Sequence, residues 1–338
     1  MAWNFFFFLL LGSACLGREV FVEPVGKVRI DAHEKTLQQI DRTQTHILKA
    51  TAKENLELAL AYIKKQYPEM RLDQLELLSF NYRLQNYAPP FDPPLFTCSL
   101  LVDFRDNGSL KIKKDSPQST DWEYFSYTAD LGFNTGALAV QTHFNARKLK
   151  GSLHEEKNSS EAEREAILRK PEKGLFFSNT KAAPLSAWRG FGKGDLSLSP
   201  VGEIFFKRHM ATLESKTLTQ ERLVSGPTCN DCIGMAMALI FKKYADISPR
   251  DLSLQDMYYS LPNYFSPRSP RHPQCHLHVT FIETPSRQTL ERPGQMTKWR
   301  YSLYQSDFYS YPNAEEVYMP VYARKSAIDY DPPKAVSE

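Results

Sequence analysis

A strongly apolar helix that begins with two cysteines constrains the fold of this chain most. Residues 226–244 read GPTCNDCIGMAMALIFKKY, and apolar side chains dominate the part from Ile233 to Tyr244. A helix that is apolar on most of its sides must be buried, so we expect other elements to cover it. Cys229 and Cys232 stand at its start. Three roles are open for them: a disulfide, half of a metal site, or a nucleophile.

The length and charge of the chain exclude some classes of protein. The 338 residues are 42% hydrophobic and 24% charged, which predicts a folded chain long enough for two domains of roughly 100–200 residues each. The 42 basic and 39 acidic residues are mixed along the sequence and give a net charge of +3. This balance provides no basic surface for nucleic acid, so we expect no nucleic-acid partner.

The N-terminus predicts export. Residues 1–17 contain an apolar core from Phe5 to Leu11, followed by small residues, and a core this short is typical of a signal peptide and not of a membrane anchor. We expect cleavage after Gly17, with a lipoprotein cysteine at Cys15 as the alternative. No later segment has the length and hydropathy of a membrane span. The mature chain is therefore expected to be secreted or periplasmic, without stable membrane insertion.

Residues 18–148 are predicted to form a helix-on-sheet α+β domain. Ala52–Tyr67 carries an apolar stripe at helical spacing, and Leu75–Leu84 is rich in strand formers. In Phe96–Phe104 every second residue is apolar, which predicts a strand with one buried face. Asp106-Asn-Gly predicts a hairpin turn into a further strand that begins at Ser109. This order resembles the architecture of the cystatin-type fold, in which an antiparallel sheet wraps one helix.

The second half is predicted to be a separate α+β domain. Residues 149–173 are charged and poor in apolar side chains, so they are expected to link the domains, with the second covering residues 174–338. The aromatic-rich segment Lys298–Pro312 predicts a strand pair in the second core. No internal repeat is expected from the sequence.

In an exported chain the cysteines suggest disulfides. Four remain after the signal peptide, namely Cys98, Cys229, Cys232 and Cys275, and they allow up to two bonds. Cys98 lies on the apolar face of its predicted strand, where it fits as a small buried hydrophobe. A bond from Cys229 or Cys232 to Cys275 would staple the helix to a later strand and stabilise the fold by about 3–4 kcal/mol.

The same residues also suggest a metal site. Cys229-x2-Cys232 and Cys275-x2-His278 supply three thiolates and one imidazole, a ligand set that suits tetrahedral zinc.

A nucleophile is the third hypothesis. A thiol in the first turn of a helix has its pKa lowered by the helix dipole and by unpaired amide groups, and a histidine is needed to accept its proton. Cys232 lies at the predicted helix start. His278 opens an apolar strand, and His276 shares a face with it because the two alternate along that strand.

The segment around Cys232 resembles a known enzyme family. About residues 225–283 are similar to the NlpC/P60 branch of papain-like cysteine hydrolases, whose nucleophile segment reads Asp-Cys-Ser-Gly-Leu. The residues that carry the resemblance are Asp231-Cys232-Ile233-Gly234-Met235, Tyr244, Ile247, Pro249-Arg250, Ser253, Gln255 and His278. Gly226-Pro-Thr-Cys-Asn-Asp-Cys232 is also similar to the papain-type Cys-Gly-Ser-Cys. The chain departs from the family in having Ile233 where the family has serine.

The resemblance implies a papain-like helix-plus-sheet domain and a secreted thiol-dependent amide hydrolase. It assigns Cys232 as nucleophile and His278 as base, with Glu283, Asp307 and Asn313 as candidates for the orienting group. Such an enzyme needs no cofactor and acts on a peptide or protein substrate. Two alternatives stay open: a non-catalytic secreted binding module with structural disulfides, and a structural Cys3His zinc protein. The sequence leaves the oligomeric state open.

Overall fold

The computed structural model describes ten stretches of the chain. They are residues 19–22, 26–86, 96–135, 140–156, 196–198, 201–262, 275–291, 298–312, 317–318 and 321–330. The expected signal peptide at residues 1–17 and residues 157–173 of the expected linker lie outside these described stretches.

In the described stretches, one antiparallel sheet of nine strands forms the main layer. The strand order is β12-β11-β10-β9-β3-β4-β5-β6, and β13 also pairs with β11. The bounds of these strands are β12 (Val317–Tyr318), β11 (Lys298–Pro312), β10 (Cys275–Leu290), β9 (Leu252–Pro262), β3 (Leu75–Asn86), β4 (Phe96–Asp115), β5 (Ser119–Thr135), β6 (Val140–Glu156) and β13 (Val321–Tyr330). Two small hairpins, β1 (Glu19–Val22) with β2 (Gly26–Arg29) and β7 (Leu196–Leu198) with β8 (Gly202–Ile204), lie outside this sheet.

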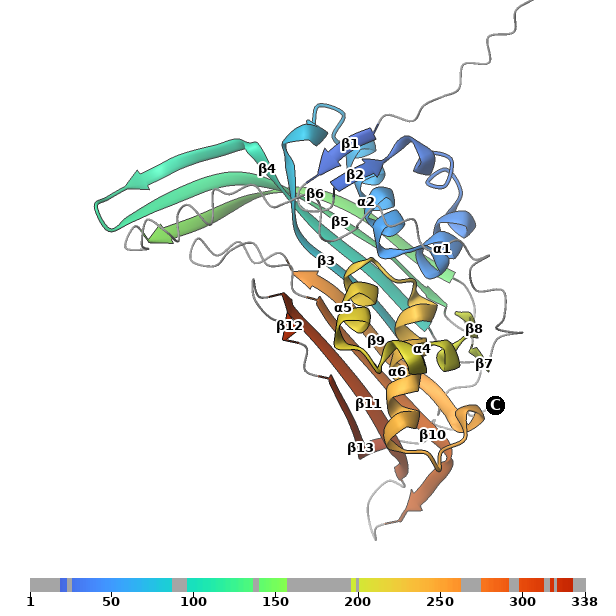
Figure 1. The fold of residues 1–338 in the computed structure, drawn as a ribbon. Helices are drawn as coiled ribbons and strands as arrows, with labels where there is room; N and C mark the ends of the chain where they lie inside the picture. The colour runs from blue at the N-terminus through green and yellow to red at the C-terminus, as the bar shows by residue number, and fades with distance from the viewer. Residues whose placement is uncertain are drawn as a thin grey trace, which may run out of the picture.

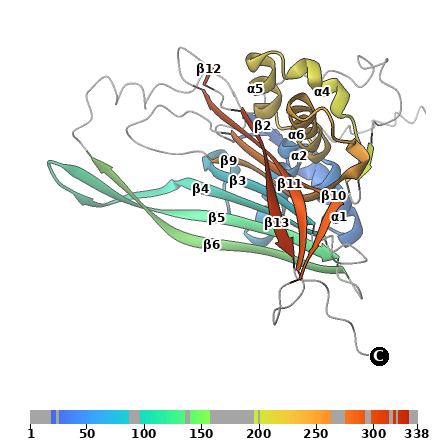
Figure 2. The ribbon, with the colours of Figure 1, turned by 90° about the horizontal axis from the view of Figure 1, so that it is seen from below.

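The five α-helices of the described stretches lie on one face of the sheet (Figures 1 and 2). They are α1 (Ile40–Lys49), α2 (Ala52–Gln66), α4 (Phe206–Thr212), α5 (Lys216–Val224) and α6 (Cys229–Lys243). Short 3-10 helices occur at Asp31–His33, Leu72–Gln74 and Pro249–Asp251. This large antiparallel sheet with helices confirms the expected α+β class. Among the described residues, no helix combines the length and the hydropathy that a membrane crossing requires.

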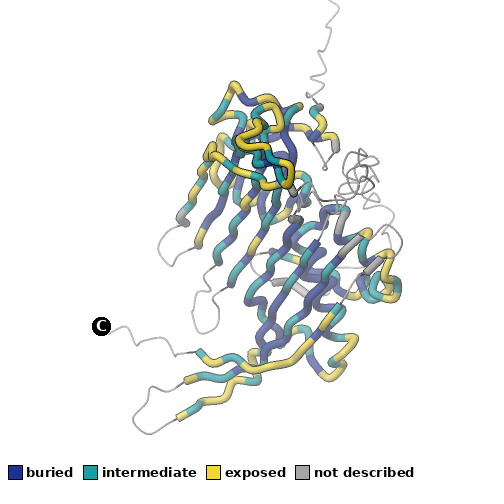
Figure 3. The backbone as a smooth tube through the Cα atoms, turned by 90° about the vertical axis from the view of Figure 1, so that its left-hand side faces the viewer, coloured by how far each residue is buried: buried dark blue, intermediate teal, exposed yellow. Residues whose placement is uncertain are grey.

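The first half confirms the predicted helix and the predicted alternation. Helix α2 begins with a capping box, in which the Thr51 side chain accepts from the backbone N–H of Glu54 and the Glu54 carboxylate accepts from the Thr51 backbone. On β4 the five apolar side chains at alternate positions, Phe96, Cys98, Leu100, Val102 and Phe104, are all buried. Figure 3 shows the same burial along the middle of the sheet and exposure at the far ends of its strands.

The predicted hairpin turn at Asp106-Asn-Gly is wrong. Strand β4 runs on to Asp115, and its register with β5 shifts between Asp106 and Lys111, so the segment is a bulge inside a long strand. The side chains explain why it does not turn back. The Asn107 amide donates to the buried Glu76 carboxylate (3.1 Å) and its oxygen accepts from Arg105 (2.9 Å), which holds the segment against β3.

Two further segments differ from the sequence predictions. Residues 149–156, the start of the expected linker, continue β6 and pair with Ser119–Ser126 of β5, because backbone hydrogen bonds along β5 do not require apolar side chains. Residues Lys298–Pro312 form one long strand, β11, in place of the expected strand pair.

The structure contains an internal repeat, which the sequence analysis did not predict. Each half has a 15-residue helix with a threonine-led capping box, then a 3-10 helix, then antiparallel strands. The equivalent residues are 177 positions apart: Thr51 and Thr228 (228 − 51), Tyr67 and Tyr244 (244 − 67), and Tyr82 and Tyr259 (259 − 82). The two threonine caps and the two tyrosine C-caps have nearly the same backbone angles.

The repeats meet on a pseudo-two-fold axis at the centre of the sheet. Strands β3 and β9 pair antiparallel with Tyr82 opposite Tyr259, and Thr51 forms a bridge with Thr228. Each of these pairs joins a residue to its own equivalent, as in an isologous dimer interface. The expected domains 18–148 and 174–338 therefore share one sheet and one hydrophobic core.

Replacement of Arg105, the cation beside the buried Glu76, tests whether their ion pair stabilises the bulge. We expect Arg105→Met to lower the free energy of unfolding by about 3–5 kcal/mol, because the Arg105 Nη2 to Glu76 Oε2 pair (2.6 Å) is buried on both sides. The control Arg83→Met breaks an exposed ion pair with Asp256 and should lower the free energy of unfolding by less than about 1 kcal/mol. Urea denaturation measures both, and equal losses would contradict the role given to Arg105.

Candidate functional site

The carboxylate next to Cys232 is occupied by structural contacts. Asp231 completes the capping box of α6, because the Thr228 hydroxyl both accepts from its N–H (3.1 Å) and donates to its carboxylate (2.9 Å). Arg208 and Arg222 also donate to this carboxylate. Burial opposes its ionisation, but hydrogen bonding with His209 and the two guanidinium charges outweigh burial and lower the pKa of Asp231 well below its ordinary value.

Cys232 lies inside the protein and not at an opening. Its side chain follows the capping box on α6, is only 1% exposed, and belongs to the main hydrophobic cluster. Burial raises the pKa of the Cys232 thiol well above its ordinary value. The helix dipole that was expected to lower this pKa is therefore outweighed by removal of the thiol from water.

The other three cysteines belong to the same core. Cys98 and Cys275 are equivalent in the repeat (275 − 98 = 177), and burial raises the pKa of each to about 12. The sulfur of Cys229 contacts that of Met257 at 3.7 Å. All four thiols are free and buried in this structure. The pairing of Cys229 or Cys232 with Cys275 stays a prediction.

His278 lies on the opposite face of the sheet from Cys232. On β10 the residues Cys275, Leu277 and Val279 are buried in the core that packs against the helices, and His276 and His278 alternate with them. Side chains at alternate positions of a strand point to opposite faces. Both imidazoles therefore lie on what we call the helix-free face, the side of the sheet that carries His276, His278 and Asp307 and that none of the described helices covers.

The predicted catalytic and zinc residues are therefore not brought together. The sheet separates the Cys232 thiol from the His278 imidazole that was expected to accept its proton. The same separation divides the expected Cys3His zinc set, since Cys229, Cys232 and Cys275 lie in the core and His278 does not. Sequence spacing suggested both sites, but it contains no information on which face of a strand meets the helix.

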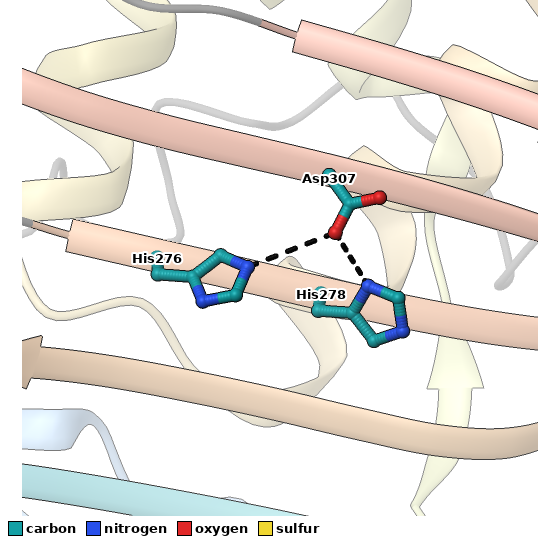
Figure 4. Close-up of side chains that lie close together, drawn as sticks. All are labelled: His276, His278 and Asp307. Atoms are coloured by element: carbon teal, nitrogen blue, oxygen red, sulfur yellow. Dashed lines mark hydrogen bonds and ion pairs between the residues drawn. The ribbon is translucent and has the colours of Figure 1, made fainter.

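Three side chains do converge on the helix-free face (Figure 4). His278 Nδ1 donates to Asp307 Oδ1 at 2.5 Å, and His276 Nε2 lies 3.7 Å from the same oxygen. The cluster is half-buried, with 28%, 22% and 12% of the side chains of His276, His278 and Asp307 exposed. Burial opposes ionisation of the carboxyl, but the two imidazoles outweigh it and lower the pKa of Asp307 below its usual range.

Aromatic rings hold one of the histidines in place. The ring of Tyr309, on β11, stacks on His276 with centroids 4.2 Å apart and planes at 12°. Tyr258, on β9, meets the same ring edge-on at 5.7 Å and donates its hydroxyl hydrogen bond to Asn81 (2.8 Å). These contacts restrict the rotation of the imidazole and direct it at the carboxylate.

Of the three expected orienting groups, Asp307 contacts His278. Glu283 instead accepts a hydrogen bond from the Tyr304 hydroxyl at 3.1 Å, and Asn313 lies outside the described residues. The sequence contained a signal for this cluster in the alternation of His276 with His278. It could not show that Asp307 is opposite His278 in the β10–β11 register.

Comparisons of the chain with protein-family models, with curated proteins and with solved structures found no match. The resemblances to NlpC/P60 hydrolases and to the cystatin-type fold therefore stay predictions.

Replacement of the buried carboxylate at the start of α6 has a predicted pH dependence. We expect Asp231→Asn to lower the free energy of unfolding at neutral pH by roughly 1–3 kcal/mol through weaker charged hydrogen bonds. The folded-state pKa of Asp231 is lowered, so its contribution is complete above the unfolded-state pKa of about 4 and is lost as pH falls below it. The difference from the unsubstituted protein, measured by urea denaturation from pH 7 to pH 3, should therefore shrink. A difference that stays constant with pH would contradict this origin.

Proposed function

We propose that the chain is a secreted, non-catalytic binding module and not a thiol hydrolase. One observation carries the proposal: the Cys232 thiol and the His278 imidazole lie on opposite faces of one continuous sheet. Residues 1–17 support export in the way the sequence predicts, as a short apolar core followed by small residues.

The chemistry of thiol catalysis supports the same choice. A cysteine nucleophile needs a base within hydrogen-bond reach and enough thiolate at working pH. Among the described residues no histidine forms a hydrogen bond with the Cys232 sulfur, and burial raises the pKa of its thiol. His278 has an oriented carboxylate partner in Asp307, yet no cysteine among the four that the structure describes lies on its face.

We propose the helix-free face as the binding surface, with a peptide or protein as partner. Long strands present polar side chains there on a rigid backbone, including the Arg83–Asp256 pair at the junction of the two halves. Aromatic rings add contact area at little cost in conformational entropy. Tyr322, which is 56% exposed, faces Asp307 across the β11–β13 pair and lies close to the histidine cluster.

Thiol labelling tests the proposal. We expect iodoacetamide at neutral pH to leave all four cysteines of the native chain unmodified, because they are buried and burial raises the pKa of each. Peptide mass spectrometry after unfolding identifies the state of each residue. Labelling after unfolding alone shows free thiols, as in the structure, and labelling only after added reductant shows a disulfide of the kind predicted from the sequence.

The control for this experiment is Cys232→Ser. An electrophilic probe for cysteine hydrolases should label neither the unsubstituted protein nor this variant. Rapid labelling of the native protein at Cys232, abolished in Cys232→Ser, would show a reactive nucleophile and would overturn the proposal.

A further inference from the structure

We propose that His276, His278 and Asp307 form a binding site for a divalent transition-metal ion of the zinc class. The ligand atoms of the three side chains all lie within 4.8 Å of one another. The inference goes beyond the proposed function, because it holds whether or not a protein partner binds the same face.

The strand geometry brings the ligands together without any loop. His276 and His278 are two residues apart on β10, so both imidazoles leave the sheet on one face. Asp307 is opposite His278 in the β10–β11 register. Zinc-to-ligand bonds of about 2.0–2.1 Å in a tetrahedron place ligand atoms roughly 3.4 Å apart. The two nitrogen-to-Oδ1 distances, 3.7 and 2.5 Å, lie on either side of that value and need only small side-chain rotations.

A buried nitrogen that lacks a hydrogen bond is a second observation that points to a ligand. His276 Nε2 is shielded from solvent and has no hydrogen-bond partner, although its ring is directed at Asp307. Buried polar atoms in proteins are nearly always paired, and an exception requires an explanation. A cation between Nε2 and the carboxylate would satisfy the nitrogen, and the stacked Tyr309 ring already holds the imidazole in the required direction.

The internal repeat shows that the same strand pairing forms in the first half without equivalent histidines. The positions equivalent to His276, His278 and Asp307, each 177 residues earlier, are Ser99, Leu101 and Asp130. The register is also equivalent, because Leu101 is opposite Asp130 as His278 is opposite Asp307. The first half retains only the aspartate, which pairs with a single histidine, His143, at 3.1 Å. The same backbone therefore accepts serine and leucine where the second half has two imidazoles.

The ligand set defines the chemistry of the ion. Two imidazole nitrogens and one carboxylate oxygen suit zinc and its neighbours cobalt, nickel and copper better than calcium or magnesium, which prefer oxygen ligands. Three protein ligands leave a fourth tetrahedral position for water or for a donor group of a binding partner. That position lies on the helix-free face, because all three side chains do.

The experiment is a metal titration of the chelator-stripped chain. We expect isothermal titration with ZnCl2 to show one binding site. His276→Gln, His278→Gln and Asp307→Asn should each lower its zinc affinity by more than roughly 100-fold, because loss of a residue that only supports a ligand lowers metal affinity by up to about that factor. With CoCl2 the visible spectrum should be that of a tetrahedral ion with nitrogen and oxygen ligands and should lack a thiolate charge-transfer band. Zinc should also raise the Tm of the unsubstituted protein and not that of the three variants.

The repeat provides a matched control and a gain-of-function test. Asp130→Asn changes the equivalent aspartate and should leave the zinc affinity unchanged within about twofold, because a substitution at a distant, independent site alters the free energy of another site by no more than that. The double substitution Ser99→His with Leu101→His copies the site into the first half and should add a second zinc equivalent. Absence of zinc binding to the unsubstituted chain, equal affinity in His276→Gln, or a thiolate band with cobalt would each overturn the proposal.

Discussion

The antiparallel pairing of β3 with β9 is the interaction on which the rest of the structure depends. It joins two helix-on-sheet units through Tyr82 and Tyr259 into one sheet, and Thr51 and Thr228 bridge the starts of the two long helices beside it. An isologous contact of this kind buries the edge strand of each unit, which would otherwise be open to aggregation. It also places the described helices on one side of the sheet, so one large core spans both halves and none of the described helices covers the other face.

This one-sided arrangement decides the chemistry available to each residue. Core positions receive the four cysteines, whose thiols lose contact with water and become poor nucleophiles. The helix-free face receives His276, His278 and Asp307, which lie close together, with the two imidazoles partly exposed and Asp307 buried. Alternation along β10 therefore separates thiol chemistry from imidazole chemistry by the thickness of the sheet. This separation supports the binding role that we propose for the helix-free face over that of a Cys–His enzyme.

The two repeats use the same backbone for different purposes. Where Asp130 has one histidine partner in the first half, its equivalent Asp307 has two in the second. The two long helices have identical apolar residues at some equivalent core positions, such as Ala59 and Ala236 or Ile63 and Ile240. The first half has long distal ends on β4, β5 and β6, which extend away from the helices (Figure 2). The repeats differ on exposed faces and at strand ends, and also inside the core, where the buried Asn55 and Glu57 of α2 are equivalent to Cys232 and Gly234 of α6.

The sequence by itself determined the local elements. Apolar spacing located α2 and α6, and alternation located the buried face of β4, because these signals depend only on residues a few positions apart. Even the repeat was present, as a constant offset of 177 residues that includes Tyr67 and Tyr244. Only the tertiary structure decided the rest. Asn107 turned a predicted hairpin into a bulge through contacts with Glu76 and Arg105, and the β10–β11 register placed Asp307 opposite His278. Both depend on strands paired across long sequence distances, where local propensity carries no information about register or face.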